Sequence, residues 1–372
     1  MSRNLKYLIW PFWLAILVWP FAKLRGALWV LLAGLVGAAL LFALKSWAPT
    51  IALPAVPRMA GLSGRTRTGL LVVLVICSLA LPLGLNKYFL DVVIMAGIYI
   101  VLALGLNIIV GLAGLLVLGY IAFYAAGAYS YAILSTHYHL NFFLALPVGA
   151  ILALLFGLLL GLPTLRLRGD YLAIVTLGFG EIARIVLNNW DGLTGGPNGI
   201  MHIGRPGLAG LNLGKPVHIY YIVLAFIALV ALLIDRLNHS RLGRALIAMR
   251  EDEAAARACG IDTTRLKILA FCLSAAVAGA MGVVYAAKMS FISPESFSFW
   301  ESVMVLCMVV LGGMASVPGV ILGALALIVL PEAFRQFQSY RMLVFGAAMI
   351  AMMIFRPQGL LPSRRRKMEL ED

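Results

Sequence analysis

Long apolar runs separated by short polar segments dominate this sequence. A transmembrane helix needs about 20 mainly apolar residues, with a range of roughly 17–25. The runs lack the strict alternation of polar and apolar residues that marks the strands of a membrane barrel. The pattern therefore predicts an all-α integral membrane protein, a polytopic helical bundle with about 10–12 apolar segments. The candidate segments are 8–22, 27–44, 69–85, 92–110, 112–134, 144–162, 171–187, 219–235, 267–287, 302–314, 317–331 and 341–355.

The polar interruptions divide the chain into three regions. Residues 1–68 contain a candidate membrane hairpin at 8–44 and a linker with several prolines and arginines, so they read as an N-terminal extension. Residues 69–362 hold the remaining apolar segments, and 363–372 form a basic tail. Within the core, LGGMASVPG interrupts 302–331, which predicts either a crossing followed by a half-helix or two short tilted helices.

Basic residues gather in four segments between the apolar runs. Because an excess of Lys and Arg marks cytoplasmic loops, we expect these four segments and both chain termini on the cytoplasmic side. The segments 86–91, 135–143, 188–218 and 288–301 then lie on the opposite side. The basic segments are 45–68, 166–170, 236–266 and 363–372.

Composition supports a membrane protein and narrows its class. Apolar residues make up 63% of the chain and charged residues 12%, whereas soluble domains are about half apolar and about a quarter charged. The formal net charge of +14 follows the loops, so it does not indicate nucleic acid. The four cysteines and five histidines show no metal-ligand spacing, and we expect no metal site. No pairing of a nucleophile with a base is visible, so we expect no catalytic residues.

The longest charged segment is RALIAMREDEAAARACGIDTTRLK, residues 244–267. Three successive acids would be very costly in hydrocarbon, so it is not a span. Its composition favours helix, Gly260 is a natural stop, and Asp262 or Thr263 can cap the helix that follows. We expect a short cytoplasmic helix, a turn and then a membrane helix. The residues alone leave open whether it is a docking element or a solvated linker.

A few polar residues interrupt the apolar runs. Glu181 and Arg184, three positions apart, share a helix face and can pair, either in a translocation path or as a structural pair. Asn107 and Gly111 predict either a broken helix that lines a path, with Tyr120 in the same region, or close packing through small residues.

Several blocks of the sequence resemble the branched-chain amino acid permease family of ABC importers, in particular its LivM-type subunit. The segment EDEAAARACG resembles the coupling loop that docks on the ATPase, although its glycine comes one place later than in the commonest form. The other blocks are GLNIIVGLAGLLVLGYIAFYAAGAY (105–129), LRLRGDYLAIVTLGFGEIARI (165–185), TGGPNGI (194–200), FISPESFSFWES (291–302), VVLGGMAS (309–316) and FRPQGLLP (355–362).

This resemblance implies a transmembrane permease subunit of an ABC importer for branched-chain amino acids, with a type II-like fold in the inner membrane. Its implied partners are a second, LivH-like permease subunit, two cytoplasmic ABC ATPases and a periplasmic substrate-binding protein. The chain has no GxxxxGK[ST] motif, so we expect no cofactor on this chain and ATP hydrolysis by the partner subunits.

The resemblance and the expected topology together assign candidate residues. Candidates in the translocation path are Asn107, Gly111, Tyr120 and Glu181, and candidates for docking the binding protein are Thr194, Asn198, Glu295 and Glu301. The coupling loop is expected to dock through Arg250, Glu251, Asp252, Glu253, Ala254, Ala255 and Gly260.

Two other functions stay open on the sequence. The same machine could carry urea, amides or other amino acids. An ion-coupled secondary transporter would need no ATPase, but the charged segment and the scarcity of acids within the spans argue against it.

Overall fold

A computed structural model describes part of the chain in detail. The described residues are 78–82, 84, 86–165, 167, 169–208, 211–212, 214–333, 346 and 359–361. The chain divides into two units, Met1–Cys77 and Ser78–Asp372, and only the second is considered below. The expected segments 8–22 and 27–44, most of 69–85, all of 341–355 except residue 346, the linker 45–68 and the basic tail lie outside the described residues.

The described part is mostly helical, as predicted. Five helical segments are long and apolar enough to cross a membrane: Lys87–Leu112, Phe142–Thr164 (α5), Pro216–His239 (α8), Thr263–Met289 (α11) and Pro294–Gly312. The first comprises α3 (Lys87–Asn107) and the π-helical turn η2 (Ile108–Leu112), and the last ends with α12 (Phe299–Gly312). Among the described residues, three further helices belong to the bundle: α4 (Ile121–Tyr138), α6 (Asp170–Asn189) and α13 (Val317–Ala333).

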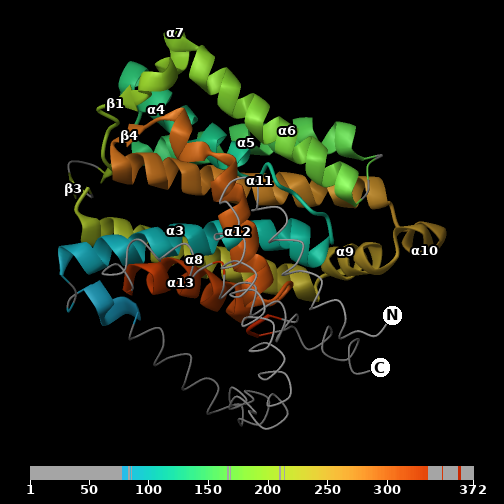
Figure 1. Ribbon diagram of the computed structural model, residues 1–372. Coiled ribbons are helices and arrows are strands. Elements are labelled where there is room, and N and C mark those ends of the chain that lie inside the picture. Colours follow the sequence, from blue (N-terminus) through green and yellow to red (C-terminus); the bar gives the residue numbers. More distant parts are fainter. Residues whose placement is uncertain are drawn as a thin grey trace, which may run out of the picture. The chain divides into compact units, whose positions relative to one another are not determined.

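Short elements cap the two ends of the bundle (Figure 1). One end carries α7 (Asp191–Thr194), η3 (Gly196–Asn198), η4 (Pro294–Phe297) and two antiparallel strand pairs, β1 (Ile200–Met201) with β4 (Phe291–Ile292) and β2 (Gly207–Leu208) with β3 (Leu211–Asn212). The other end carries α9 (Arg241–Glu251) and α10 (Glu253–Ala258). The expected separation of 188–218 and 288–301 from 236–266 is thus observed.

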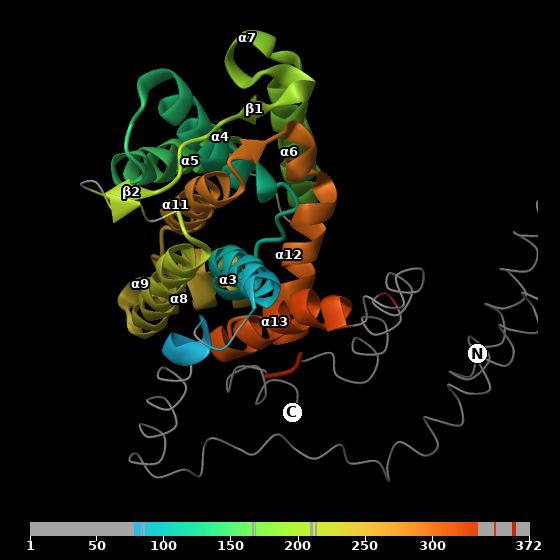
Figure 2. The same ribbon diagram turned by 90° about the vertical axis from the view of Figure 1, so that its left-hand side faces the viewer.

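Helix α3 lies at the centre of the bundle. Figure 2 views α3, α8 and α11 nearly end-on and α12 from the side; α11 lies on one side of α3, and α8, α12 and α13 lie around the rest of it. From Ala96 to Asn107 nearly every residue of α3 is buried, so this helix is apolar on all faces because it contacts protein on all faces.

Small residues bring α4, α5 and α11 into close contact. A Cβ atom on Gly127 of α4 would overlap the backbone of Gly279 on α11, and one on Gly279 would overlap Ala153 of α5. Close backbone approach of this kind is the usual basis of helix association in membranes, where lipid removes the hydrophobic driving force.

The chain breaks between α3 and α4, and here the expected span 112–134 is wrong. After η2 the chain is not helical through 113–120, and α4 begins only at Ile121. Gly114 has φ +69°, a conformation that favours glycine. The amide of Leu118 donates to Thr176 Oγ1 (3.0 Å) and that of Ile121 to Ser302 Oγ (3.0 Å), so neighbouring helices replace the lost helical partners.

The stretch 302–331 is also interrupted, as both predicted alternatives require. Helix α12 ends at Gly312, a turn follows, and α13 begins at Val317. The turn contains Gly313 (φ 112°) and Ala315 (φ 63°), and the second is unusual for a residue with a side chain.

The close packing at Gly279 yields a stability prediction. Gly279→Ala should lower the free energy of unfolding by about 1–3 kcal/mol, because the added methyl group overlaps α5. Gly178→Ala is the matched control: nothing lies within 4 Å of its added methyl group, and alanine is the better helix former by about 1 kcal/mol. Thermal unfolding of the purified chain in detergent measures both, and equal midpoints for the two variants would contradict the packing.

Candidate functional site

The charged segment forms a bent connection between two membrane helices, which we call the elbow (residues 240–262). It begins where Ser240 caps α9 by accepting a hydrogen bond from the amide of Gly243 (3.1 Å). The expectation of a single helix here is wrong, because the helix stops at Glu251. Asp252 is extended, and its Oδ1 accepts from the amides of Ala254 (2.8 Å) and Ala255 (3.0 Å), which starts α10. Aspartate favours such a cap over a place inside a helix.

The second half of the elbow ends as the sequence predicted. Helix α10 stops at Ala258, and Gly260 has φ +82° in the turn that follows. Asp262 caps α11 by accepting from the amide of Arg265 (3.1 Å), whereas Thr263 is the first helical residue and is buried. The elbow is therefore joined directly to a membrane helix of 27 residues.

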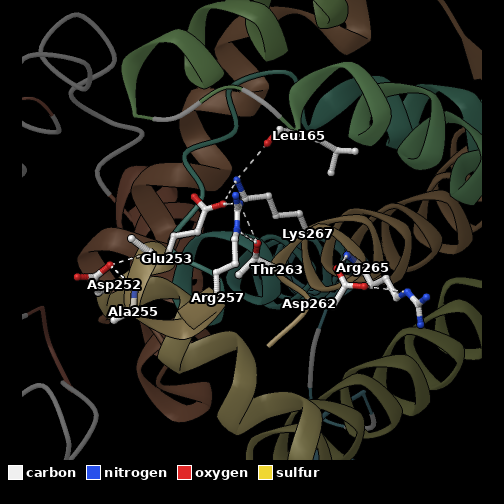
Figure 3. Close-up of polar contacts among 10 residues, drawn as sticks. Leu165, Asp252, Glu253, Ala255, Arg257, Asp262, Thr263, Arg265 and Lys267 are labelled. Carbon is white, nitrogen blue, oxygen red and sulfur yellow. Dashed lines mark hydrogen bonds and ion pairs between the residues drawn. The ribbon is translucent and has the colours of Figure 1, made fainter. Parts of the chain in front are cut away.

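A buried ion pair fastens the elbow to α11 (Figure 3). The Nζ atom of Lys267 lies 2.9 Å from Oε1 of Glu253, and these side chains are 4% and 13% exposed. Arg257 binds the same oxygen (2.9 Å) and also donates to Thr263 Oγ1. Lys267 donates in addition to the carbonyl of Leu165, at 3.4 Å, so the pair connects α10, α11 and the end of α5.

Lys267 was not among the residues proposed from the sequence. It stands at the first position of the expected span 267–287, where a lysine resembles an ordinary charged flank. The only available signal was its place near the N-terminus of a helix that follows an acidic segment. Its burial depends on the bend at Asp252, which turns Glu253 toward it.

Arg250 also points into the protein. Its Nη1 donates to the carbonyl of Gly111 (2.9 Å) in η2, while Nε and Nη2 donate to Oε1 of Glu251. The side chain is 19% exposed, compared with 51% for Glu251. The residues expected to dock on an ATPase thus fall into two sets. Arg250 and Glu253 form the inner face of the elbow, and the outer face consists of Glu251, Asp252, Ala254, Ala255 and Gly260, all exposed.

Asn107 and Gly111 lie together at a junction with the turn between α12 and α13. The buried Asn107 accepts from the amide of Ala315 (2.9 Å), and its Nδ2 has no hydrogen-bond partner among the residues that the structure describes. A side chain on Gly111 would overlap both Asn107 and Ala315. The amides of Leu360 and Leu361 donate to the carbonyls of α12 residues at the same turn (2.8 and 3.1 Å).

Tyr120 is buried at the C-terminal end of the non-helical segment 113–120. Its hydroxyl donates to the carbonyl of Ser274 on α11 (3.3 Å), and the Ser274 hydroxyl donates to the carbonyl of Gly105 (2.6 Å). Tyr120 therefore connects the end of the break to α11, which in turn is hydrogen-bonded to α3. It belongs to the same region as Asn107 and Gly111, as expected, but does not share their hydrogen bonds.

Glu181 lies apart from these residues, on α6, where it pairs with Arg184 (2.9 Å). Their side chains are 32% and 35% exposed. The neighbouring face of α6, which includes Thr176 and Gly180, is buried against the bundle, and the face on the other side of the pair carries exposed apolar side chains such as Ile182. The helix thus has a polar edge between a packed face and an apolar exposed face.

The residues expected to dock a binding protein lie at the end of the bundle opposite the elbow. The strand pair β1–β4 brings their two loops together, pairing Ile200 with Ile292. Asn198 and Glu295 are exposed there. Thr194 is buried and donates to two carbonyls near the end of α6.

Glu301 is also turned inward, because it accepts a hydrogen bond from the hydroxyl of Tyr99 on α3. Two of the four expected residues are therefore available for contact, and two hold the loops in place. Across the described ranges, no three His, Cys, Asp or Glu side chains gather closely enough to hold a metal ion.

Comparisons with known proteins agree with this architecture. Residues 88–353 match the family model "Branched-chain amino acid transport system / permease component". The chain is 46% identical to the high-affinity branched-chain amino acid transport system permease protein LivM of Escherichia coli K12, over 81% of this chain and 76% of the relative. No solved structure matches the chain.

More distant relatives include a second type of permease. The chain is 28% identical to the probable branched-chain amino acid transport permease protein LivM of Methanocaldococcus jannaschii, over 59% of this chain and 68% of the relative. It is 33% identical to the LivH permease protein of Escherichia coli K12, over 37% of this chain and 45% of that protein.

The ion pair at the base of α11 yields a second stability prediction. Lys267→Met should lower the free energy of unfolding by about 1–3 kcal/mol, less than the roughly 3–5 kcal/mol for an ion left without a partner, because Arg257 still binds Glu253. Adding Glu253→Gln should recover part of this loss, since it removes the buried carboxylate that Lys267 no longer neutralises. Thermal unfolding in detergent measures each variant.

Arg265→Met is the matched control, because this exposed side chain pairs with Asp262 in water and should contribute less than about 1 kcal/mol. Equal losses for the Lys267 and Arg265 variants would show that burial gives the Lys267 pair no special weight.

Proposed function

The chain belongs to the family of branched-chain amino acid transport permeases, and we propose that it forms half of the translocation path of an ABC importer for leucine, isoleucine and valine. As a permease component it is a transport subunit, and ATP hydrolysis lies in other subunits of the system. The proposed cargo rests on the similarity to a LivM permease, which extends over most of both chains. The elbow, two short polar helices between two membrane helices, supports coupling to a motor.

The proposed membrane is the inner membrane, with the elbow and both termini in the cytoplasm. The arginines of the elbow, together with Arg236 and Arg265 beside it, support this orientation through the positive-inside rule, which counts Lys and Arg and not net charge. The outer face of the elbow then meets the ATPases, two copies of which would serve the pair of permeases. Its exposed alanines, Ala254 and Ala255, present a narrow helix that fits a groove without steric conflict.

The second permease subunit is proposed to be LivH-like, and α6 supports its location. An ion pair halfway along a spanning helix is expensive in lipid and usually faces protein or water. We place the polar edge of α6, with Glu181 and Arg184, toward the translocation path between the two permeases, and the apolar face with Ile182 toward the partner or lipid.

Asn107, Gly111 and Tyr120 are proposed to shape the path from the other side. Non-helical backbone at membrane depth is tolerated where it is buried in protein or lines a cavity, and 113–120 is the non-helical backbone between Gly111 and Ile121. At the opposite end, we propose that Asn198 and Glu295 contact a periplasmic binding protein that delivers the substrate, while Thr194 and Glu301 position their loops.

Uptake by the reconstituted complex tests the cargo and the energy source. With ATP and the binding protein present, labelled leucine should accumulate, unlabelled isoleucine and valine should compete with it, and orthovanadate should abolish uptake. Competition by urea or amides instead would assign a different cargo. Uptake that resists vanadate but is lost with an ionophore would overturn the proposal in favour of ion coupling.

The outer face of the elbow can be tested without disturbing its internal contacts. Ala255→Arg should reduce the ATPase that co-purifies with the permease about tenfold or more, because an unmatched bulky cation at a docking surface costs at least about 1.4 kcal/mol. Arginine sustains a helix nearly as well as alanine, so α10 should persist. Asn198→Arg, at the other end of the bundle, is the control that should leave ATPase binding unchanged. Normal ATPase binding by the Ala255 variant would remove α10 from the docking surface.

A further inference from the structure

Arg250 is the side chain of α9 that joins the elbow to the central helix of the bundle. Its Nη1 atom donates to the carbonyl of Gly111 at 2.9 Å, in the last turn of the span Lys87–Leu112. Its aliphatic stem lies against Gly114, where an added Cβ would overlap the Arg250 Cγ atom. Arg250 therefore contacts the chain on both sides of the point where the central helical span ends: Gly111 before it and Gly114 after it.

The orientation of this guanidinium group is fixed by Glu251. Both Nε and Nη2 donate to the same carboxylate oxygen, at 3.0 and 2.7 Å, which leaves Nη1 directed at the carbonyl of Gly111. Hydrogen bonds from a charged donor are about twice as strong as neutral ones. The side chain of Arg250, which we call the arm, is thus oriented by Glu251 of the elbow and hydrogen-bonded at its end to the central span.

The point of attachment is a part of the backbone that can change its conformation. The turn at 108–112 is π-helical, a geometry that occurs mostly as single turns and often at functional sites. Gly114 follows in a left-handed conformation, and 114–119 lies outside the helices on either side. Within this stretch the amide of Leu115 still donates to the carbonyl of Ile109 in η2. A few such residues can absorb a hinge motion.

We propose that Arg250 transmits the displacement of the elbow into this break, and that it acts on the translocation path through Gly111 and Gly114 without contacting the ATPase. This role rests on the proposed function, because it presupposes a motor that moves the elbow. Gly111 in turn packs on Asn107, which holds Ala315 in the turn after α12. Movement of α9 would therefore reach both breaks of the bundle through one arginine.

Loss of a residue that transmits motion should change the coupling between ATP hydrolysis and uptake, whereas loss of a docking residue should release the ATPases. Measurements on the complete transporter distinguish these two outcomes. In the reconstituted complex, Arg250→Ala should keep its ATPases and continue to hydrolyse ATP. The number of ATP molecules hydrolysed per leucine imported should rise about tenfold, within the range of coupling between distant sites. Arg250→Lys retains a cationic donor and should restore part of the coupling. Arg241→Ala, exposed at the start of the same helix, should leave the ratio unchanged.

Gly114→Ala provides a second route to the same effect. Its methyl group would displace the Arg250 stem, so the ratio should rise although the arginine is intact. If Arg250→Ala does not insert, Arg250→Gln shortens the arm with less loss of packing and should also raise the ratio.

Three results would overturn the proposal. A ratio within twofold of the unaltered protein would show that the arm transmits nothing. Loss of the ATPases from a folded Arg250→Ala variant would make Arg250 a docking residue. Parallel loss of hydrolysis and uptake at an unchanged ratio would make it a structural one. Absence of ATP-dependent uptake by the unaltered complex would instead refute the proposed function itself.

Discussion

Backbone amides at membrane depth need partners from within the protein, and this constraint governs how the bundle is assembled. A straight helix satisfies the constraint alone, but the chain between η2 and α4 is not helical and needs its neighbours. Thr176 of α6 and Ser302 of α12 each accept an amide hydrogen bond from this break. Gly119 allows the necessary approach, because a side chain there would overlap the backbone of α6 at Thr176. The positions of α6 and α12 are therefore linked to this break, because their hydroxyl groups satisfy two of its amides.

Charged groups obey the same constraint, with different consequences in two places. Glu181 and Arg184 neutralise each other within one turn of α6, so their ion pair does not tie α6 to another helix, and it gives α6 a polar edge. Glu253 and Lys267 belong to separate helices, so neutralising their charges ties α10 to α11. Because a buried charge is costly to leave without its partner, the two helices resist separation. A displacement of the elbow must then carry the base of α11 with it.

The sequence predicted five of the apolar helices in the described part of the chain, the position of the elbow and its end signals, because these depend on local composition and on residues such as Gly260 and Asp262. It did not predict the break at 113–120. Apolar periodicity continues through that stretch, and the hydroxyl groups that stabilise it come from distant segments. Asp252 could not be told from its acidic neighbours, although it alone turns the chain. Nor does a sequence tell an inward arginine from an outward one: the direction of Arg250 depends on where the central span ends.

The junction at Gly111 joins several sequence blocks that are far apart along the chain. Its contacts run mainly to backbone atoms: the carbonyl of Gly111, the amide of Ala315, and the carbonyls of Leu311 and Gly312. Backbone contacts require close approach, which explains why the blocks that meet here are rich in glycine. Packed cores switch between discrete arrangements because they cannot deform continuously. A junction of hydrogen bonds between helix breaks can exchange partners without repacking bulky side chains, so it is the part of this bundle best suited to alternate between two states while α3 stays rigid beside it.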